Sequence, residues 1–285
     1  MSKMKTLLRF HRTCYHIHFP VSYSGVRNRP TVLSFNRFEK KKNVALAIDS
    51  FALFKQQLST AEETQNSLRN PRLIVGGGYD PRVEENMMTL VSLVDRTKAA
   101  RLAYTIITPS SSKTAIPPFN MTHESPDVIF LLNFTTSQRA ALLSALSTLA
   151  LLYTPANEHF GIVPVEAMSS GLPVLACNSG GPTESIVDDP QHLRTGWLRA
   201  PEAASWAAAL LEIAELSPDE RSALAGRARA RAREHLGMEA MGRKLESALL
   251  EAAEMGPVPV PAALWFSSFV LVALFAYFMA TVYAS

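Results

Sequence analysis

The chain of 285 residues contains only two cysteines, Cys14 and Cys177, which lie far apart in the sequence. Such a pair excludes a disulfide framework and is typical of a protein in a reducing compartment. No group of Cys and His residues has the spacing of a zinc site, so the sequence predicts no metal ligand set. The net charge of +3 is too small to indicate nucleic acid as a partner.

Acidic residues are absent before Glu39, whereas basic residues such as Lys3, Arg9 and Arg12 are present. A basic, acid-free N-terminus is one feature of a mitochondrial transit peptide, but no clear amphipathic Ser-rich helix accompanies it here. Residues 1–30 show no convincing hydrophobic period and are too few for a domain. We therefore expect this segment to be poorly ordered, with a targeting peptide as the alternative.

Charge is also absent from residues 262–284, which are predominantly apolar. About 20 apolar residues in a helix cross the hydrocarbon core of a bilayer. Trp265 and Tyr283 lie near the two ends, where interfacial aromatic residues occur. A buried core helix is the alternative, but such helices seldom run this long without a charge. We predict one C-terminal transmembrane helix, and the upstream Arg243 and Lys244 place the main body in the cytosol.

Strand-like and helix-like patterns alternate in the rest of the chain. The predicted strands are residues 31–36, 72–75, 103–108, 128–132, 150–154, 173–177 and 195–199, and the predicted helices include residues 44–58 and 137–149. This alternation predicts an α/β fold of the Rossmann-like, doubly wound kind, with a parallel sheet covered on both faces.

Further segments complete the predicted organisation. Residues 109–126 are rich in Ser, Thr and Pro and are expected to form a loop. Residues 203–254 have helical periodicity, with a capping box from Ser217 to Glu220 and Pro218 at the first helical position. The predicted domains are therefore residues 31–254, a Pro-rich linker at 255–261 and the transmembrane helix at 262–284.

Residues 157–184, NEHFGIVPVEAMSSGLPVLACNSGGPTE, carry the strongest functional signal. Glu158 and Glu166 are separated by seven residues, and Pro164 is well placed to open a helix. The later turn at residues 180–182 is rich in glycine. A carboxylate at a strand end, free backbone amides and a helix start are the parts needed to hold an anionic, hydroxyl-rich ligand. A nucleotide sugar is such a ligand.

Two further candidate groups follow the first two predicted strands, where an open parallel sheet binds its ligands. Arg37, together with Lys42 at the expected start of the next helix, has the charge to neutralise a diphosphate. The alternative is that residues 40–42 form a solvated basic face. Residues 76–78 are three glycines, which indicate either a tight turn or a close ligand approach and do not match a dinucleotide fingerprint.

The two glutamates also have a structural alternative. Glu166 is placed where it could cap its own helix, and Glu158 where it could pair with a nearby lysine. Two glutamates at a fixed spacing are uninformative without the surrounding sequence.

The surrounding motifs resemble a known family. EHFGIVPVEAM with the later NSGGPTE is similar to the signature of the family 4 retaining glycosyltransferases of the GT-B fold, and SFNRFEKKKN resembles their Arg/Lys element. LIVGGGYDPRVEEN and VIFLLNFTTSQRAALLSA further resemble the dolichol-pathway mannosyltransferases within that family. The resemblance covers residues 31 to about 254. It implies the C-terminal half of a GT-B enzyme, with residues 1–30 a remnant of the N-terminal domain.

The resemblance implies GDP-mannose as the donor substrate and no required cofactor. The acceptor would be a dolichol-diphosphate-linked oligosaccharide, lengthened through α-1,3 and α-1,6 linkages during synthesis of the N-glycan precursor. The implied location is the endoplasmic reticulum membrane, with other dolichol-pathway mannosyltransferases as partners. Transfer would proceed with retention at the anomeric carbon.

The resemblance also implies roles for individual residues. Arg37 and Lys42 would hold the donor diphosphate, Glu158 would meet the mannose hydroxyls, and Glu166 would meet the ribose. The remaining donor-binding residues would be Phe160, Gly161 and Ile162, whose amides face the departing phosphate, and the glycines Gly77, Gly180 and Gly181. His159 is expected to be a turn residue rather than a general base.

Two other functions remain open from the sequence. The first is a non-catalytic half-protein that binds a nucleotide sugar without the acceptor domain, and the second is a transferase that uses a UDP- or ADP-sugar. Arg227, Arg229, Arg231 and Arg233 are expected to form a solvated face, with contact to anionic headgroups as the alternative. The sequons at Asn120 and Asn133 would stay unused in a cytosolic body.

Overall fold

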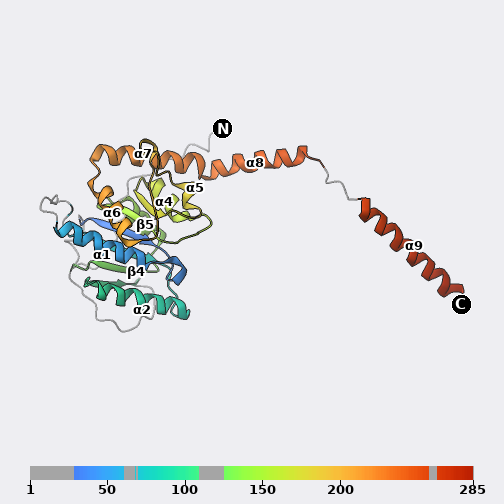
Figure 1. Cartoon of the computed structure of the whole chain (residues 1–285), viewed down its shortest axis with the longest axis horizontal. Coiled ribbons are helices and arrows are strands. Elements are labelled where there is room, and N and C mark those ends of the chain that lie inside the picture. Colours follow the sequence, from blue (N-terminus) through green and yellow to red (C-terminus); the bar gives the residue numbers. More distant parts are fainter. Residues whose placement is uncertain (1–28, 61–67, 69, 109–124, 257–261, 285) are drawn as a thin grey trace, which may run out of the picture. The chain divides into compact units, whose positions relative to one another are not determined.

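The computed structural model describes residues 29–60, 68, 70–108, 125–256 and 262–284 (Figure 1). The chain divides into two compact units, Met1–Gly237 and Met238–Ser285. This division falls inside the predicted domain 31–254. Most of the predicted N-terminal remnant, of the loop at 109–126 and of the Pro-rich linker lies outside the described residues, as does Asn120.

The first unit contains a seven-stranded sheet in the order β3-β4-β2-β1-β5-β6-β7. Every neighbouring pair of strands is parallel. The strands are β1 (Thr31–Phe35), β2 (Arg72–Gly77), β3 (Tyr104–Ile107), β4 (Val128–Leu132), β5 (Thr148–Tyr153), β6 (Val174–Cys177) and β7 (Trp197–Arg199). Strands β2, β3 and β4 lie on one side of β1, and strands β5, β6 and β7 lie on the other. The strand order therefore reverses between β1 and β5, and such sheets bind their ligands beside this topological switch point.

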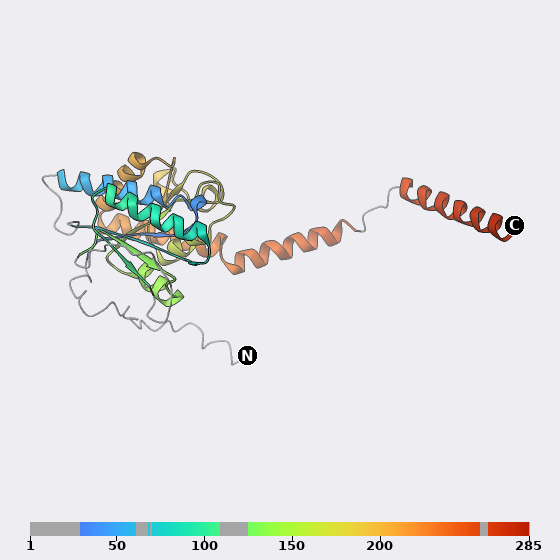
Figure 2. The ribbon, with the colours of Figure 1, turned by 90° about the horizontal axis from the view of Figure 1, so that it is seen from below.

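Helices cover both faces of this sheet (Figures 1 and 2). They are α1 (Ala45–Thr60), α2 (Glu84–Ala99), α3 (Thr136–Ser144), α4 (Ile162–Ser170), α5 (Pro182–Ser185), α6 (Ala203–Glu215) and α7 (Pro218–His235). One core joins α1, α2 and α6 to the sheet, and the other joins α3, α4 and α7 to it. Adjacent residues of β1 pack into different cores: Val32 lies in the first core and Leu33 lies in the second. The predicted doubly wound parallel fold is confirmed.

Some predicted boundaries are wrong. The helix predicted at 137–149 ends at Ser144, and β5 begins already at Thr148. The Thr148 hydroxyl donates to the Leu142 carbonyl at 2.8 Å, which satisfies a helix-terminal acceptor and lets the chain turn directly into the strand. Two of the three glycines at 76–78 lie inside β2 instead of following it. Helix α2 had no counterpart among the predicted elements.

The basic cluster on α7 is only in part the solvated face that was predicted, because Arg229 and Arg233 are exposed but three of the four arginines also bind neighbouring backbone. Arg229 donates to the Ser170 carbonyl at 3.0 Å, and Arg231 donates to the carbonyls of Glu184 and Ser185 at 2.6 Å each. Guanidinium groups are well suited to the last carbonyls of α4 and α5, where the peptide dipoles place negative charge. Three of the four arginines therefore hold neighbouring segments, since Arg227 also donates to the Arg194 carbonyl.

The capping box predicted at the start of α7 is confirmed. The Ser217 hydroxyl accepts from the Glu220 amide, and the Glu220 carboxylate accepts in return from the Ser217 amide. Replacing Ser217 by alanine is expected to lower the free energy of unfolding by about 1 kcal/mol. Thermal unfolding of the full chain in nonionic detergent should show this as a melting point lower by about 2–4 °C. Ser222→Ala, at an exposed position on the same helix, should leave the melting point unchanged.

The second unit contains α8 (Met238–Glu254) and α9 (Ala262–Ala284). The predicted transmembrane segment is helical throughout its described length. Within it, the 20 residues Leu264–Tyr283 have a mean hydropathy of 1.9, and none of them is buried. By length and composition, α9 is a candidate membrane span.

Candidate functional site

The candidate site lies at the carboxyl ends of β1 and β5 and is centred on one ion pair. Lys42 Nζ lies 2.5 Å from Glu158 Oε2, and their side chains are only 12% and 29% exposed. Lys42 ends a short turn, Lys40–Lys42, instead of starting α1, which begins at Ala45. The structure therefore brings together a predicted cation and a predicted carboxylate that are 116 residues apart.

Thr154 positions the backbone of Lys42. Its hydroxyl donates to the Lys42 carbonyl at 2.7 Å and accepts from the Asn36 side-chain amide at 3.4 Å. The Thr154 carbonyl in turn accepts from the buried Cys177 thiol at 3.3 Å. Thr154 is fully buried, so these hydrogen bonds tie the ends of β1, β5 and β6 together beneath the ion pair. Sequence reasoning missed this residue, although a polar residue directly after a buried strand was an available signal.

The loop between β5 and α4 leads three backbone amides to the start of a helix. Gly161 has φ of +80°, which favours glycine, and an added Cβ there would lie only 2.9 Å from the Tyr153 ring. Both the backbone conformation and the lack of space therefore require glycine. Among the described residues, no acceptor is recorded for the amides of Phe160, Gly161 and Ile162. They lie at the N-terminus of α4, where the helix dipole favours an anion. Pro164, expected at the first position of α4, is its third residue.

The glycines of the second turn serve a close approach between two loops. The Gly181 amide donates to the Glu158 carbonyl at 2.7 Å, so it is already occupied. A Cβ at Gly180 would lie 2.3 Å from that carbonyl oxygen, and one at Gly181 would lie 2.4 Å from the Phe160 Cα. These two glycines hold the loop that carries Glu158.

Gly77 has a comparable role on the other side of the ion pair. A Cβ there would lie 1.8 Å from the Asn36 carbonyl oxygen. The chain leaving β1 therefore passes very close to the backbone at the end of β2, and the glycine permits that approach before Lys42 is reached.

Glu166 pairs with a residue that the sequence did not single out. Arg139 on α3 lies 3.0 Å from Glu166 Oε2, in an ion pair that lacks hydrogen-bond geometry. Glu166 is the fifth residue of α4 and makes no cap hydrogen bond, so the alternative that it caps its helix is wrong. Its carboxylate is partly exposed at 29%.

Arg37 lies apart from the central ion pair. Its side chain is 63% exposed and pairs with Glu39 at 2.9 Å, and Glu39 also pairs with Lys41 at 3.4 Å. The solvated basic face predicted as the alternative for residues 40–42 therefore fits Lys41 but not Lys42. Glu39 is a second residue that sequence reasoning missed.

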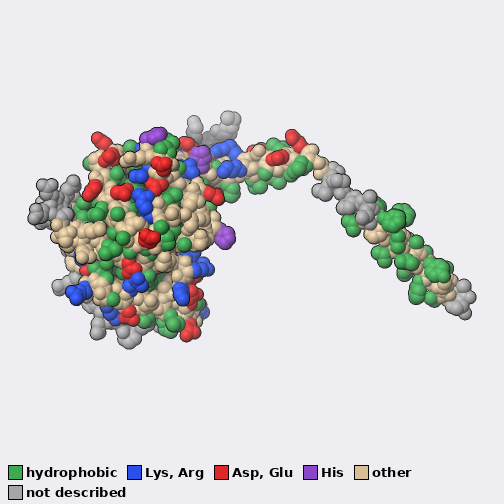
Figure 3. Space-filling model, in the orientation of Figure 1, with side chains coloured by type: hydrophobic (Ala, Val, Ile, Leu, Met, Phe, Trp, Pro, Cys, Tyr) green, Lys and Arg blue, Asp and Glu red, His purple; other side chains and the backbone are tan. Residues whose placement is uncertain are grey.

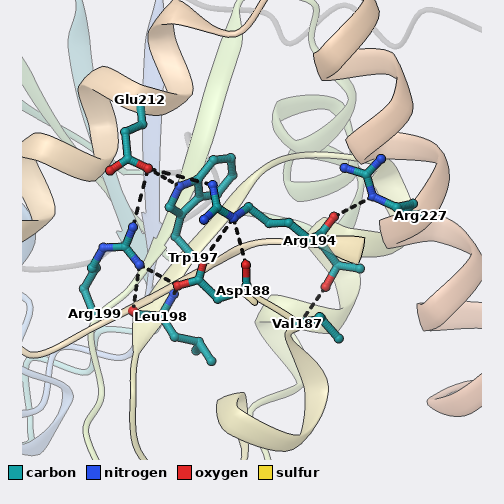
Figure 4. Close-up of polar contacts among 9 residues, drawn as sticks. Val187, Asp188, Arg194, Trp197, Leu198, Arg199, Glu212 and Arg227 are labelled. Atoms are coloured by element: carbon teal, nitrogen blue, oxygen red, sulfur yellow. Dashed lines mark hydrogen bonds and ion pairs between the residues drawn. The ribbon is translucent and has the colours of Figure 1, made fainter. Parts of the chain in front are cut away.

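A network of ion pairs fixes the chain that follows the second glycine turn (Figure 4). Asp188 pairs with Arg194 at 2.9 Å and with Arg199 at 2.5 Å. Glu212 on α6 accepts from the Trp197 indole at 2.8 Å and lies 3.4 Å from Arg199. These contacts anchor the segment after α5 to the edge strand β7 and to α6, which fixes the far end of the loop carrying Gly180 and Gly181.

Two buried acids beneath the site are held in their neutral forms. Burial, and secondarily the charge of Glu158, raises the pKa of Tyr153. Burial raises the pKa of the Cys177 thiol to about 11. Cys177 is therefore a neutral thiol at neutral pH. Because the unfolded chain ionises this thiol more easily, the folded state should lose stability as pH rises from about 9 towards 11.

The state of Cys177 can be measured by alkylation. In a Cys14→Ser background at pH 8, iodoacetamide should label the folded chain at least about 100-fold more slowly than the denatured chain. The raised pKa alone lowers the thiolate fraction by about that factor. Equal rates would show that Cys177 is exposed and ionised, which contradicts its place under Thr154.

Within the described ranges, no group of three or more His, Cys, Asp and Glu side chains is placed to hold a metal ion. The positive charge at the site comes from Lys42, from the more distant Arg37 and from the α4 amides. This arrangement has the chemistry to bind a phosphate beside a carboxylate that accepts hydrogen bonds from hydroxyl groups.

Comparison with known proteins agrees with this geometry. Residues 122–233 match the family described as glycosyl transferases group 1. The chain is 41% identical over 194 residues to the α-1,3/1,6-mannosyltransferase ALG2 of Candida glabrata, covering 65% of this chain and 38% of that protein. It is 37% identical over 218 residues to its Saccharomyces cerevisiae counterpart, covering 75% and 41%. The chain thus spans less than half the length of these relatives.

Solved structures show the same fold. A sucrose-phosphate synthase from Thermosynechococcus elongatus superposes with a TM-score of 0.57 at 20% identity, over 80% of this chain and 47% of that one. Anabaena HepE in complex with UDP and glucose superposes with a TM-score of 0.57 at 21% identity, over 80% and 50%. The resemblance read from the motifs is therefore confirmed: residues 122–233 match the glycosyl transferases group 1 family, and the chain is similar to α-1,3/1,6-mannosyltransferases.

Proposed function

We propose that this chain is a retaining mannosyltransferase that moves mannose from GDP-mannose to a dolichol-diphosphate-linked oligosaccharide, through α-1,3 and α-1,6 linkages. The observation that carries the proposal is the ion pair between Lys42 and Glu158 beside the unpaired amides of the α4 N-terminus. The similarity to α-1,3/1,6-mannosyltransferases supports mannose as the transferred sugar.

In this proposal the donor diphosphate lies between Lys42 and the amides of residues 160–162. These groups supply positive charge to the departing GDP, and their preformed positions lower the cost of organising them during the reaction. Because Lys42 is only 12% exposed, its attraction to phosphate is weakened less by water than that of a surface lysine. The Arg37 side chain is 63% exposed, so phosphate can reach it and replace Glu39 as its partner. The proposal involves no metal or cofactor.

The two glutamates take separate parts of the donor. Glu158 accepts hydrogen bonds from mannose hydroxyls and reaches them from the same edge as Lys42. Glu166 accepts from the ribose diol, and the ion pair with Arg139 holds its carboxylate in place. We propose that Gly77, Gly180 and Gly181 serve donor binding through the close backbone approaches that they permit.

The proposed location is the endoplasmic reticulum membrane, with α9 as a single span and the first unit facing the cytosol. The length and apolar composition of α9 support this, as do Arg243 and Lys244 on its N-terminal side. In functional terms we propose residues 31–254 as the nucleotide-sugar-binding domain with its C-terminal helices, residues 255–261 as the linker and residues 262–284 as the anchor.

The second candidate is a non-catalytic half-protein that binds a nucleotide sugar. The ion pair between Lys42 and Glu158 lies where the donor is proposed to bind, so it suits this candidate as well.

Transfer by the full chain in membranes tests the proposal. Radiolabelled GDP-mannose and a short dolichol-diphosphate-linked oligosaccharide should yield a longer labelled lipid, whereas UDP-glucose should yield none. Binding of GDP-mannose without transfer would favour the half-protein. Transfer of glucose from UDP-glucose would contradict the assigned donor.

A further inference from the structure

Tyr153, the last residue of β5, carries a hydroxyl group that the proposed mechanism does not yet use. The residue is buried, with only 4% of its surface exposed. Among the described residues, no hydrogen bond to the Tyr153 hydroxyl is recorded. A buried polar group without a partner costs free energy, and in native proteins such a group marks bound water or a functional role. The hydroxyl therefore calls for a partner from outside the described chain.

The tip of the Tyr153 ring lies against the start of α4. Tyr153 and Leu151 pack into the core that also contains α4 residues, because alternate residues of a strand face the same side of the sheet. Gly161 directly precedes α4. An added Cβ at Gly161 would lie 2.9 Å from the Tyr153 hydroxyl oxygen and 3.0 Å from Cζ. The hydroxyl is thus directed at the helix N-terminus, beside the middle one of the three amides of residues 160–162.

The chemistry of this hydroxyl suits an anion at the start of α4. Burial raises the pKa of Tyr153, so the phenol is protonated at neutral pH and is able to donate a hydrogen bond. The carboxylate of Glu158, whose charge also acts on Tyr153, is already bound by Lys42. An anion held at the helix N-terminus would provide the missing acceptor.

Individual donors are important for phosphate binding because the charge of the chain is mixed. The net charge is only +3, and Figure 3 shows basic and acidic side chains interspersed over the visible face of the first unit. A surface of this kind provides little long-range attraction for an anion. The affinity for a phosphate group then depends on short contacts with the donors around it.

We propose that the Tyr153 hydroxyl donates a hydrogen bond to the distal phosphate of the donor, beside the amides of residues 160–162. The inference rests on the diphosphate site proposed above. During transfer the bond between the anomeric carbon and the distal phosphate oxygen breaks, and its electron pair stays on that oxygen. The hydrogen bond strengthens as this negative charge develops, so the hydroxyl stabilises the leaving group while it keeps its own proton.

Removal of the hydroxyl alone tests the inference. Calorimetric titrations of the full chain in nonionic detergent compare Tyr153→Phe with the unaltered chain, using GDP and GMP as ligands. GDP affinity should fall about tenfold in the variant, within the range expected for a hydrogen bond to a charged group. GMP affinity should not change, because GMP lacks the distal phosphate. The melting temperature should not fall, since phenylalanine keeps the ring and no recorded hydrogen bond of the free protein is lost.

Tyr104→Phe is the matched control. Tyr104 lies on β3, at the far edge of the sheet from the α4 loop, and its hydroxyl is also buried without a hydrogen bond. This variant should leave the affinities for both nucleotides unchanged.

Unchanged GDP affinity in Tyr153→Phe would overturn the inference and would leave water as the partner of the hydroxyl. Equal losses for GDP and GMP, or a lower melting temperature with such losses, would overturn it in favour of a structural role. If the unaltered chain bound GDP no more tightly than GMP, the proposed diphosphate site itself would fail. The failure of the inference and the failure of the proposed function are therefore distinguishable.

Discussion

Replacing Gly77 with alanine is expected to destabilise the protein severely. The new Cβ would lie 1.8 Å from the carbonyl oxygen of Asn36 and 2.6 Å from its carbonyl carbon. Both obstacles are backbone atoms at the end of a buried strand, so no side-chain rotation relieves the overlap. The free energy of unfolding should fall by more than about 3 kcal/mol, at the upper end of what overpacking costs.

The adjacent glycine supplies the control. A Cβ at Gly78 would meet only Cγ of Arg37, at an ordinary contact distance of 3.6 Å. Gly78→Ala should therefore change the free energy of unfolding by no more than about 0.5 kcal/mol. Denaturant titration of both variants in nonionic detergent gives the comparison. Equal stabilities would show that the chain after β1 does not approach Gly77 as closely as described.

Replacing Glu158 with glutamine should strengthen GDP binding while it abolishes most transfer. Lys42 Nζ is held by the Glu158 carboxylate at 2.5 Å, so a diphosphate must compete with that carboxylate for the ammonium group. Glutamine keeps the shape but removes the competing charge. A charge-assisted hydrogen bond contributes about 1.5–3 kcal/mol, so a gain of up to about tenfold in GDP affinity is expected, which corresponds to 1.4 kcal/mol.

Mannose transfer should change in the opposite direction. Loss of the carboxylate that we propose meets the mannose hydroxyls is expected to lower the transfer rate by roughly 10²–10³-fold, the usual cost of removing one well-placed polar group from a reaction centre. Calorimetric titration with GDP and the radiolabelled transfer assay measure the two effects separately. Glu215→Gln, at an exposed position on α6, should alter neither. Weaker GDP binding with full transfer would refute the assigned role of Glu158.

Most of the fold could be predicted from the sequence, because strands that are buried on both faces appear as continuous apolar runs. Segments such as residues 128–132 and 173–177 are short apolar runs between turn residues, and the structure has strands there. The boundary between α3 and β5 could not be predicted. It depends on the hydrogen bond from the Thr148 hydroxyl to the Leu142 carbonyl, which no periodic pattern reveals. Helix α2 has only four buried residues, one of them Thr97, and its apolar Met87 and Met88 are exposed, so its apolar residues do not mark one clear face.

The charged residues of the site could be predicted from the sequence, but the residues that position them could not. The spacing of Glu158 and Glu166 and the family motifs singled out both carboxylates. Thr154 and Arg139 were missed because their roles depend on partners from distant elements. The glycines of the site were identified as donor ligands, yet what the backbone requires of Gly181 is close packing against Phe160. The motif therefore predicted the position of the site correctly but not the contacts that each of its residues makes.

Titration of the full chain with nucleotide sugars tests the central claim most directly. GDP-mannose should bind at least about tenfold more tightly than UDP-glucose or ADP-glucose, a preference of about 1.4 kcal/mol. Glu166→Ala should weaken GDP-mannose binding without changing the melting temperature. Equal affinity for the three donors, or unchanged GDP-mannose affinity in Glu166→Ala, would contradict the assignment of this edge of the sheet as a GDP-mannose site.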